Sequence, residues 1–581
     1  MEKGSHLYNI RHSLSHVLAM AVLDNYPNAK IAIGPAIETG FYYDIDFGDQ
    51  KISDADLKDL QKKMKKIIGQ KLPFSHTPVT AAEALEKFSD NPYKTELIKE
   101  FESKGTDITL YHTGDNFTDL CAGGHVEHTG EIPADAFKLD KVAGAYWRGD
   151  EKNTMLTRIY GLAFATKEEL DAHLQMLVEA EKRDHRKLGK ELELFTFSEL
   201  VGPGLPLWTP KGTLLRKLID EFVWELRKEK GYEQVTIPHL TKADLYKTSG
   251  HYDKFADELF RVQSREGREY FLKPMNCPHH TQIYDAAPRS YKDLPQRYAE
   301  TTMVYRDEQS GELAGLTRVL SITQDDAHVF ARENQVKSEM NAIWDIVEKF
   351  YGAFGFDNMR VRLSFHDPEK IDSYLGSQET WESSERDLRE IAEERGADFF
   401  VGIGEAAMYG PKLDFIASDS LGRTHQVATI QLDRNLPERF DLECTNEQGE
   451  KERIVMIHAA IAGSLERFAG VMIEHLAGAF PFRFAPIQTT IIPVNSDVHG
   501  AKATEVAAAL KNAGFRVDFD ADNKDGMGKQ VRNAKNQKYP YWIIIGDKDI
   551  ESGTVTLESR EGEQKNLTLE QLIEKFTAEN K

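Results

Sequence analysis

The chain has 581 residues, of which 40% are hydrophobic, and 73 basic and 95 acidic side chains give it a formal net charge of −22. This length predicts about four domains, with enough apolar residues to build real cores. Three cysteines cannot form a disulfide framework, no apolar run approaches the roughly 18 residues of a membrane helix, and no secretory signal opens the sequence. We therefore expect a cytoplasmic protein with no membrane partner. Its acidity argues against indiscriminate nucleic-acid binding, so any RNA would be held by local basic patches.

The N-terminal region has the pattern of an α+β domain that ends near residue 160. Residues 5–24 predict a helix, which places His12 and His16 one turn apart on the same face. Residues 33–47 suit a turn followed by a strand. Further along, polar helices are expected over 53–70 and 80–104, before a return to strand and loop.

A connecting helix is expected over residues 166–194. It carries an apolar stripe of Leu170, Leu174 and Leu177, with a cluster of lysines and arginines behind it. Two interpretations of that cluster are open. Charge runs usually mark a solvated helix face, and an RNA-facing strut is the alternative.

The remainder of the chain divides into two regions of different pattern. From about 195 to 483, helices alternate with strand-like segments joined mostly by short turns, which favours an antiparallel sheet with helices. The prolines of AFPFRFAPIQ (479–488) mark a boundary. After it, strands alternate regularly with helices over 497–513, 528–538 and 568–578, which predicts a small α/β domain with a mixed sheet.

Two of the three cysteines lie in polar, histidine-rich settings. Cys277 stands in LKPMNCPHH, with the distant His328 and His458 available as partners. Cys121 stands in TDLCAGGH, a C-x3-H pattern that suits the H-x3-H pair near the N-terminus. Thiolate and imidazole ligands suit a borderline-soft divalent metal, and three ligands with an open fourth position suit a catalytic zinc. Ligands so scattered form no zinc-finger signature, so a buried core thiol is the alternative.

Arginine-containing motifs indicate a family. YRDEQSG (305–311) contains Arg-x-Glu and is followed by Arg318, TQDDAH and, far downstream, GSLERF; these resemble motifs 2 and 3 of class II aminoacyl-tRNA synthetases. From about residue 5 to 575 the chain is similar to the threonyl-tRNA synthetase family. The segments that carry the resemblance, in order, are KPMNCP, TQDDAH, GEAAMYGPKLDF, ATIQLD and IHAAIAGSLERF.

The resemblance implies an α+β multidomain fold and a threonine–tRNA ligase activity. ATP and L-threonine would give threonyl-adenylate and pyrophosphate, and threonine would then pass to tRNA(Thr). Mg²⁺ would accompany ATP, and each subunit of a homodimer would hold one Zn²⁺; TIPHL, with Pro238, looks like the strand that pairs subunits. The implied domains are an α+β editing domain over 1–165, the connecting helix over 166–194, a class II catalytic domain with an antiparallel sheet over 195–484, and an α/β anticodon-binding domain over 485–581.

The resemblance implies an ATP site in which arginines bind the phosphates and the adenine ring. Activation brings a carboxylate against the α-phosphate of ATP, so fixed cations must neutralise the developing charge, and the planar guanidinium suits both phosphate binding and stacking. By resemblance, Arg306 holds the α-phosphate, Glu308 lies near the adenine amine, Arg318 near the γ-phosphate, and Arg467 against the adenine ring. Further implied ATP contacts are Gln426, Thr429 and Gln431, and His251 and Lys412 complete the implied catalytic set.

The family's threonine site explains the predicted metal. Cys277, His328 and His458 match the family's zinc ligands. A hydrophobic pocket rejects an isostere such as valine by only ~10²-fold, whereas a site that requires the hydroxyl reaches ~10⁴-fold or more. The implied lining of the threonine pocket is Met275, Asp326, Tyr409 and Gln426.

Serine also offers an amine and a hydroxyl, and a missing methyl is worth only ~1–3 kcal/mol, so a hydrolytic site for seryl-tRNA is expected. The resemblance places it in the N-terminal region, metal-free by the usual interpretation, with zinc as the alternative. Its residues would be His12, His16, Asp119, Cys121 and His125. In the C-terminal region, Glu551 and Arg560 fall where anticodon bases could be contacted, although exposed loop charges explain them nearly as well.

The sequence departs from the family pattern at several points. It reads NCPHH for the usual NCPGH, so His279 is added beside the metal loop, where we expect a solvent-facing side chain, with a second-shell role as the alternative. Ile322 stands where an aromatic residue commonly stacks on adenine, and motif 2 is untypical around TTMVYRDE and ELAGLTRV. The family's ubiquitin-like N-terminal extension is expected to be absent. Two rival functions are a non-catalytic RNA-binding paralogue and a free-standing editing hydrolase.

Overall fold

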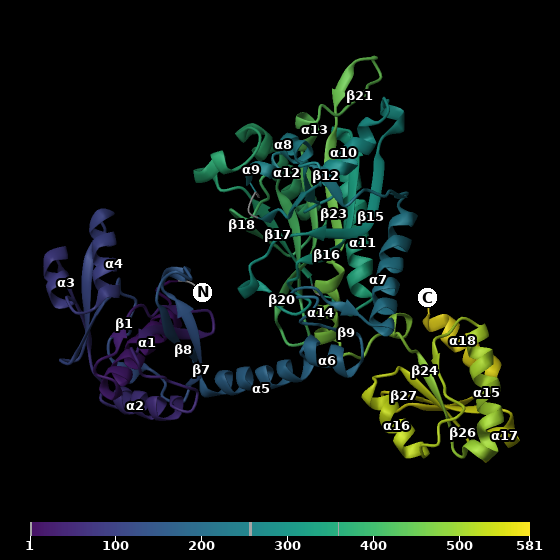
Figure 1. Ribbon diagram of the computed structural model, residues 1–581, viewed down its shortest axis with the longest axis horizontal. Coiled ribbons are helices and arrows are strands. Elements are labelled where there is room, and N and C mark those ends of the chain that lie inside the picture. The colour runs from purple at the N-terminus through teal and green to yellow at the C-terminus, as the bar shows by residue number, and fades with distance from the viewer. Residues whose placement is uncertain (1–2, 255–257, 358, 581) are drawn as a thin grey trace. The chain divides into compact units, whose positions relative to one another are not determined.

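The computed structural model describes residues 3–254, 258–357 and 359–580. These residues form two compact units, Met1–Val178 and Glu179–Lys581, and each is described by itself (Figure 1). No helix in the described part of the chain combines the length and the apolar character needed to cross a membrane.

The first unit is built on two antiparallel sheets. The larger has the order β1-β3-β8-β7 with β2 on β3, and the smaller has the order β4-β5-β6. Helix α1 (His6–Asn25) begins where the Ser5 hydroxyl accepts from the amide of Tyr8, and its buried residues form one core with β3 and α2. The expected α+β character is confirmed. The other elements are β1 (Lys30–Ile31), β2 (Ala36–Ile37), β3 (Gly40–Asp46), α2 (Leu57–Gly69), β4 (Phe74–Val79), α3 (Ala81–Lys87), α4 (Pro92–Ser103), β5 (Ile108–Thr113), β6 (Phe117–Leu120), β7 (Phe137–Tyr146) and β8 (Met155–Ala163).

Two segments that were each expected to be one helix are broken. The segment 80–104 forms α3 and α4, because Asn91 caps a new helix whose first residue is Pro92. The segment 166–194 forms α5 (Lys167–Arg183) and α6 (His185–Glu191). Asp184 interrupts them with φ −48° and ψ 121°, and its side chain accepts from the amide of Arg186, so it acts as the N-cap of α6.

The second unit is centred on an eight-stranded sheet of order β11-β15-β16-β23-β20-β19-β17-β18. All neighbouring pairs are antiparallel except β11 with β15 and β17 with β18, so the predicted antiparallel core is confirmed. The strands are β11 (Glu233–Gln234), β15 (Gln296–Tyr305), β16 (Ser321–Ala331), β17 (Met359–Phe365), β18 (Phe399–Ile403), β19 (Lys412–Ser418), β20 (Thr424–Asp433) and β23 (Val455–Ser464).

Helices bury one face of this sheet. Buried residues of α7, α11, α12 and α14 form one core with every second residue of the central strands, such as Val329, Ile430 and Ile457. The alternate residues of those strands point to the other face. The other elements of this region are the helices α7 (Pro210–Glu229), α8 (Ala243–Ser249), α9 (His251–Lys254), α10 (Cys277–Asp285), α11 (Val336–Gly352), α12 (Gln378–Glu394), α13 (Asn435–Arg439) and α14 (Leu465–His475), with short strands β9 (Phe195–Thr196), β10 (Leu207–Trp208), β12 (Leu240–Lys242), β13 (Arg261–Gln263), β14 (Glu269–Leu272), β21 (Glu443–Thr445) and β22 (Lys451–Arg453).

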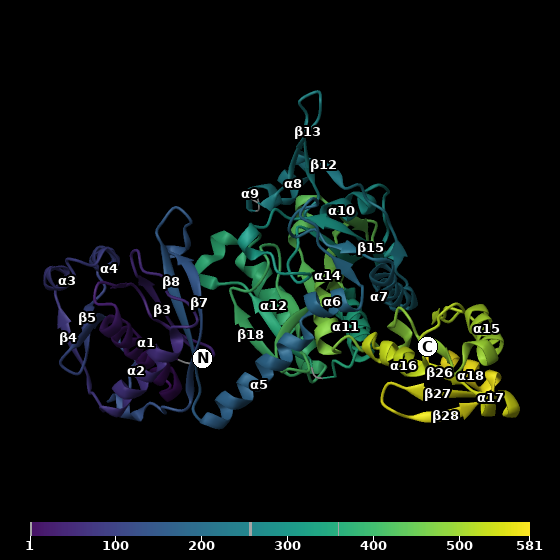
Figure 2. The same ribbon diagram turned by 60° about the horizontal axis from the view of Figure 1, so that its bottom comes forward.

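The C-terminal region has the predicted mixed sheet, of order β25-β24-β26-β27-β28 (Figure 2). The first three strands in that order pair in parallel and the last two pairings are antiparallel. The expected helices form within two residues of their predicted ends. The elements are β24 (Thr489–Pro493), α15 (Ser496–Asn512), β25 (Val517–Asp518), α16 (Met527–Asn536), β26 (Tyr541–Ile545), α17 (Asp547–Ser552), β27 (Val555–Ser559), β28 (Gln564–Leu567) and α18 (Leu569–Glu579).

The aromatic centre of the larger core gives a stability prediction. Phe350 is fully buried, and its ring lies 5.8, 5.2 and 5.0 Å from those of Phe222, Phe354 and Phe468. We expect Phe350→Ala to lower the unfolding free energy of the second unit by about 3–5 kcal/mol, measured by calorimetry of the whole chain. Phe400, partly exposed on β18, is the control. Equal losses in Phe350→Ala and Phe400→Ala would contradict this account of the core.

Candidate active sites

One cavity of about 1130 Å³ opens on the sheet face that the helices leave uncovered. It lies within the second unit. All but one of the residues predicted for activation line it, the exception being His251. The predicted residues in its wall are Met275, Cys277, Arg306, Glu308, Arg318, Ile322, Asp326, His328, Tyr409, Lys412, Gln426, Thr429, Gln431, His458 and Arg467.

Sheet register explains how residues far apart in sequence meet here. His328 on β16 lies directly opposite His458 on β23, which lies opposite Gln431 on β20, which lies opposite Lys412 on β19. Directly opposed side chains have Cβ atoms about 5 Å apart. A second row, two residues along, places Asp326 and Thr429 on either side of Ala460. Because side chains alternate along a strand, both rows face the cavity.

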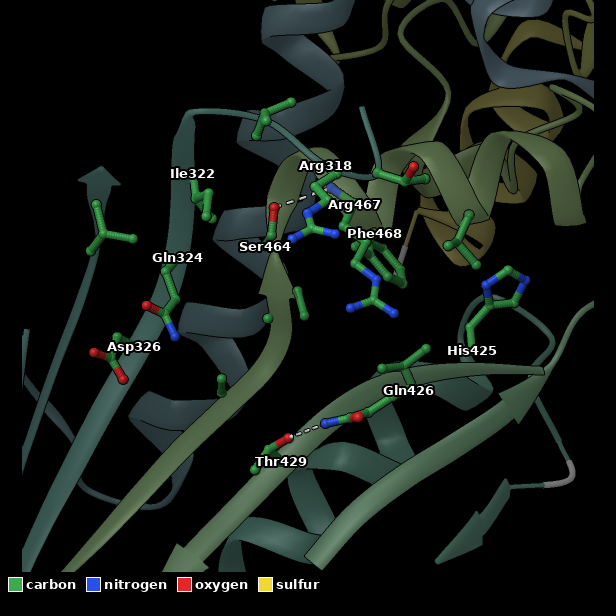
Figure 3. Close-up of a pocket in the computed structure, with 18 of the residues that line it drawn as sticks. Arg318, Ile322, Gln324, Asp326, His425, Gln426, Thr429, Ser464, Arg467 and Phe468 are labelled. Carbon is green, nitrogen blue, oxygen red and sulfur yellow. Dashed lines mark hydrogen bonds between the residues drawn. The ribbon is translucent and has the colours of Figure 1, made fainter. Parts of the chain in front are cut away.

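Arginines stand at the other end of the cavity. Arg467 lies in the first turn of α14, where Ser464 caps the helix by accepting from the Arg467 amide (Figure 3). No described carboxylate forms an ion pair with the guanidinium of Arg306 or of Arg467. Arg318, in contrast, pairs with Glu308 at 2.6 Å and with Glu312 at 3.1 Å. The cavity therefore holds two fixed cations available to an anionic ligand.

The buried carboxylate of Asp414 organises the wall formed by β19 and β20. Gln426 Nε2 and Thr429 Oγ1 each donate to Asp414 Oδ1 at 2.8 Å, and Lys412 Nζ lies 3.2 Å from Oδ2. Gln431 donates to the carbonyl of Gly410 at 3.1 Å. The predicted polar contacts of ATP and threonine are thus held in place by the protein itself. Sequence reasoning missed Asp414, whose position in a strand gives no signal.

The structure brings the three predicted metal ligands together. Cys277 begins α10, and its Sγ lies within 4.8 Å of a ring nitrogen of both His328 and His458. All three side chains are buried. Asp433 Oδ2 lies 2.9 Å from His458 Nε2 and accepts a hydrogen bond from its N–H. The other ring nitrogen of His458, Nδ1, then carries no proton, and its lone pair faces the triad. His328 Nε2 lies 3.1 Å from that nitrogen. Two ring nitrogens in this arrangement need a proton or a cation between them.

The donor set fits a zinc ion. One sulfur and two imidazole nitrogens leave a tetrahedral ion one open position. Burial raises the pKa of the Cys277 thiol well above its usual value, and nearby Asp326 and Asp433 raise it further. A bound cation acts in the opposite direction, because the ligand is the thiolate, so binding would release a proton. Metal binding at this triad stays a prediction.

Two further predicted positions, His251 and His279, are both buried. His251 is buried beside Tyr409, with ring centroids 5.8 Å apart, and its Nδ1 lies 2.7 Å from Ser249 Oγ. Burial lowers the pKa of His251 to about 3, so its imidazole is neutral. His279 was expected to face solvent, and this expectation is wrong. It is buried 6.3 Å from the Tyr246 ring, because the first turn of α10 packs inward.

The first unit contains a second cluster. His12, His16, Cys121 and His125 present ligand atoms that all lie within 4.8 Å of one another. Cys121 Sγ lies 3.5 Å from His12 Nε2 and 3.2 Å from His125 Nε2. Burial lowers the pKa of all three histidines and raises that of Cys121 to about 12. The cluster therefore consists of neutral imidazoles around a neutral thiol.

Asp119 joins this cluster through a residue that the sequence analysis missed. Its carboxylate forms an ion pair with the buried ammonium of Lys94 on α4 and accepts from the Tyr43 hydroxyl. His16 Nε2 lies 3.7 Å from the same carboxylate. Lys94 stands in a helix rich in exposed lysine and glutamate, so only the packing of α4 on the sheets distinguishes it.

The two predicted anticodon residues lie apart. Glu551 is exposed on α17, and Arg560 follows β27, so the length of that strand, ~17 Å, separates them. Arg560 donates to the carbonyl of Phe480 at 2.8 Å and pairs with Glu561. In the segment TIPHL, expected to be the strand that pairs subunits, residues 236–239 lie between β11 and β12 and only Leu240 is in a strand, as the first residue of β12. Both assignments stay predictions.

Known proteins resemble this chain over nearly all of its length. Family models match residues 260–476 (tRNA synthetase class II core domain), 488–579 (anticodon binding domain) and 108–160 (threonyl and alanyl tRNA synthetase second additional domain). A threonine–tRNA ligase of Flavobacterium johnsoniae is 48% identical over 98% of this chain and 87% of its own. One from Thermosynechococcus vestitus is 47% identical over 99% and 96%.

A solved structure agrees with these sequences. The RNA binding domain of threonyl-tRNA synthetase from Cryptosporidium parvum superposes with a TM-score of 0.65 and 36% identity, covering 68% of this chain and 98% of that one. The antiparallel sheet, its cavity and the matching core model define a class II aminoacyl-tRNA synthetase. With relatives this similar over almost the whole sequence, the chain belongs to the threonine–tRNA ligase family.

The buried Lys94–Asp119 pair yields a testable prediction. Removing one partner of a buried pair costs about 3–5 kcal/mol, because the other charge is left uncompensated. We expect Lys94→Met to lower the opening free energy of residues 1–178 by that amount, measured by hydrogen exchange on the whole chain. Adding Asp119→Asn removes the stranded charge and should restore part of the loss. A double variant at least as unstable as the sum of the single ones would refute this.

Proposed function

We propose that this chain is a threonine–tRNA ligase, which activates threonine with ATP and transfers it to tRNA(Thr), and which hydrolyses mischarged seryl-tRNA in its N-terminal unit. One observation carries the proposal. The Cys277, His328 and His458 cluster shares a single cavity with the guanidiniums of Arg306 and Arg467, with which no described carboxylate forms an ion pair. A hydroxylated amino acid and a nucleotide can therefore be held side by side.

In the activation step, an oxygen of the threonine carboxylate attacks the α-phosphorus of ATP, and pyrophosphate leaves. Arg306 binds the α-phosphate oxygens as charge develops on them, and Arg467 packs against adenine. Arg318 exchanges its partner Glu308 for the γ-phosphate, which frees Glu308 for the adenine amine. Mg²⁺ accompanies the phosphates. Gln426, Thr429 and Gln431 contact the ribose and the side of the nucleotide where Mg²⁺ binds. Lys412 adds positive charge beside them.

Selection of threonine rests on the metal triad. Cys277, His328 and His458 would hold a zinc ion, which would supply a Lewis acid for the amine and the hydroxyl of threonine. Asp326 meets the amine, and Met275, Tyr409 and Gln426 line the pocket. Valine has no hydroxyl to offer, so we expect its rejection to exceed the ~10²-fold that shape alone gives. In the transfer step, neutral His251 assists attack of the tRNA ribose hydroxyl on the carbonyl, and AMP leaves.

Serine passes this selection, so a second site corrects it. We propose that His12, His16, Cys121 and His125 position a water molecule, without a metal, and that Asp119 with Lys94 fixes their arrangement. The water oxygen attacks the ester carbonyl, the ester bond breaks, and the ribose hydroxyl leaves with a proton. Neutral imidazoles suit this role because an unprotonated ring nitrogen can accept a hydrogen bond from the water and hold it in place. Support comes from the shared cluster and from the matching family model.

The remaining assignments are also proposals. We propose an editing domain over 1–165, a catalytic domain over 195–484 and an anticodon-binding domain over 485–581, joined by the connecting segment 166–194. Glu551 and Arg560 would contact anticodon bases from opposite ends of β27. The active form would be a cytoplasmic homodimer.

The metal triad provides the sharpest test of the aminoacylation site. Cys277→Ala should remove bound zinc, measured by metal analysis, and abolish threonine-dependent ATP–pyrophosphate exchange, because two imidazoles alone hold the ion poorly. Cys444→Ala is the control and should leave both intact. Cys444 is also buried, but among the described residues it belongs to no cluster that could hold a metal ion. Exchange that survives metal removal contradicts the proposal. A non-catalytic paralogue or a free-standing hydrolase predicts no exchange in the unmodified chain.

The editing site can be tested independently. His12→Ala should slow deacylation of preformed seryl-tRNA(Thr) by at least about 100-fold, since it removes one of the groups that position the water. Threonine-dependent exchange should stay unchanged. His76→Ala, at an exposed position on β4, is the matched control. If seryl-tRNA is hydrolysed normally by the His12 variant, the N-terminal cluster is not the hydrolytic site.

A further inference from the structure

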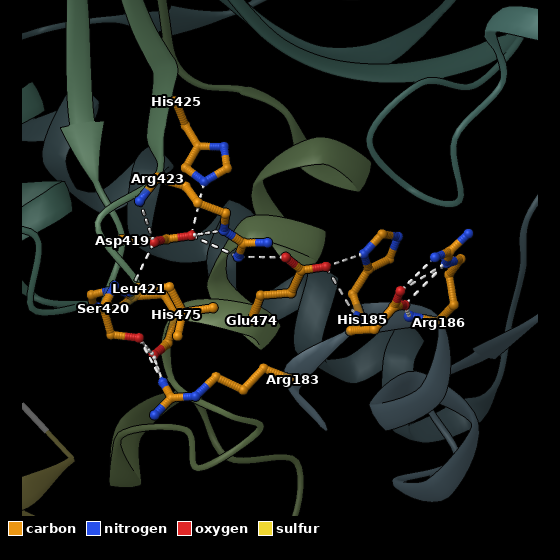
Figure 4. Close-up of polar contacts among 11 residues, drawn as sticks. Arg183, His185, Arg186, Asp419, Ser420, Leu421, Arg423, His425, Glu474 and His475 are labelled. Atoms are coloured by element: carbon orange, nitrogen blue, oxygen red, sulfur yellow. Dashed lines mark hydrogen bonds and ion pairs between the residues drawn. The ribbon is translucent and has the colours of Figure 1, made fainter. Parts of the chain in front are cut away.

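His185, the first residue of α6, is buried and fully hydrogen-bonded. Its backbone amide and its Nδ1 both donate to Oε1 of Glu474 on α14, at 3.1 and 2.6 Å (Figure 4). Its Nε2 accepts from the backbone amide of Leu316 at 3.0 Å. One neutral imidazole therefore joins a helix to a loop far away in the sequence.

The loop held by His185 is the turn that leads to Arg318. Two backbone bonds close it, from Ala314 N to Arg318 O at 3.1 Å and from Arg318 N to Ala314 O at 3.3 Å. Gly315 has φ +53°, and a Cβ atom there would lie 2.3 Å from Nε2 of His185. Leu316 is fully buried. The turn thus packs directly on the imidazole, and only glycine permits the close approach.

Both hydrogen-bond partners of His185 lie at α14, the helix whose first turn contains Arg467. Glu474 belongs to α14, and Leu316 packs against it. At Gly470 on this helix, a Cβ atom would lie 3.4 Å from Leu316 Cβ and 3.6 Å from His185 Cδ2. Through Glu474, His185 therefore fixes the turn of Arg318 relative to the helix of Arg467. These two arginines line the same cavity.

His185, Glu474 and the turn 314–318 form a junction that further ion pairs and hydrogen bonds surround. Arg423 pairs with Glu474 and with Asp419, each at 2.6 Å, and Asp419 also accepts from His425, a cavity residue (Figure 4). Arg183, at the end of α5, donates to Ser420 Oγ at 2.6 Å. The point where the connecting segment enters the second unit is therefore bonded into the wall of the nucleotide cavity.

The same junction has the residue types of a cation site, but its charges are already compensated. Ligand atoms of Asp184, His185 and Glu474 lie within 4.8 Å of one another. Asp184 pairs with Arg186 and Glu474 pairs with Arg423. His185 uses both ring nitrogens in hydrogen bonds. The cluster is a hydrogen-bonded junction between protein segments.

We propose that His185 is a positioning residue of the nucleotide site, which holds the turn of Arg318 against the helix of Arg467 so that the two cations keep a fixed separation. This inference rests on the proposed synthetase function. It goes beyond that function in assigning to the start of α6, outside the predicted catalytic domain, the positioning of two arginines that bind ATP.

The test compares substitutions at His185 by ATP–pyrophosphate exchange. His185→Ala removes both side-chain bonds and should raise the KM for ATP about tenfold, the effect of losing one or two hydrogen bonds, with the KM for threonine changed less than about twofold. His185→Gln can still accept from the Leu316 amide and should recover part of the ATP affinity. His185→Asn is too short to reach that amide and should resemble His185→Ala.

His475→Ala is the matched control, because it removes a neighbouring imidazole of α14 that contacts Ser420 and Phe356 but not the turn. It should leave the KM for ATP unchanged. The inference is overturned if the KM for ATP is unchanged in His185→Ala, or if both KM values rise together with a loss of thermal stability that His185→Gln shares. Absence of exchange in the unmodified chain would instead refute the proposed function.

Discussion

The antiparallel register of β16, β23, β20 and β19 is the constraint on which the central site depends. It sets His328, His458, Gln431 and Lys412 in one row, although 130 residues separate the two histidines along the chain. Because side chains alternate with a period of two, a slip of one residue in β23 would carry His458 to the helix-covered face and bury a polar ring among aliphatic side chains. The apolar core on one face fixes the register of the strands, and this register determines which side chains form the site on the opposite face.

Much of this arrangement could be predicted from the sequence. The strand patterns gave an antiparallel core and a mixed C-terminal sheet, and both are confirmed. The site residues followed from ordered motifs that resemble a family rather than from spacing. Nothing in the spacing of Cys277, His328 and His458 shows that they meet, because strand register depends on which strands pair, and pairing is a property of the whole sheet.

The errors and omissions have physical causes of the same kind. Residues 166–194 have a continuous helical pattern, and the break at Asp184 comes from a capping side chain together with tertiary bonds of its neighbours to Glu474 and Ser420. His279 was expected to face solvent, yet the turn that directs Cys277 inward buries it. Lys94 escaped notice because a lysine on a polar helix is normally exposed, and only a buried carboxylate partner makes its position tolerable.

All three cysteines of the chain share one property. Cys277 and Cys444 are buried and Cys121 is partly so, and burial raises the pKa of each thiol above its ordinary value. Alkylating reagents and oxidants attack thiolates, so at neutral pH the native thiols offer them little to react with. A single cysteine introduced on an exposed surface would therefore accept a maleimide fluorophore or a spin label selectively. The natural chain is already a suitable background for spectroscopic measurements on either of its two units.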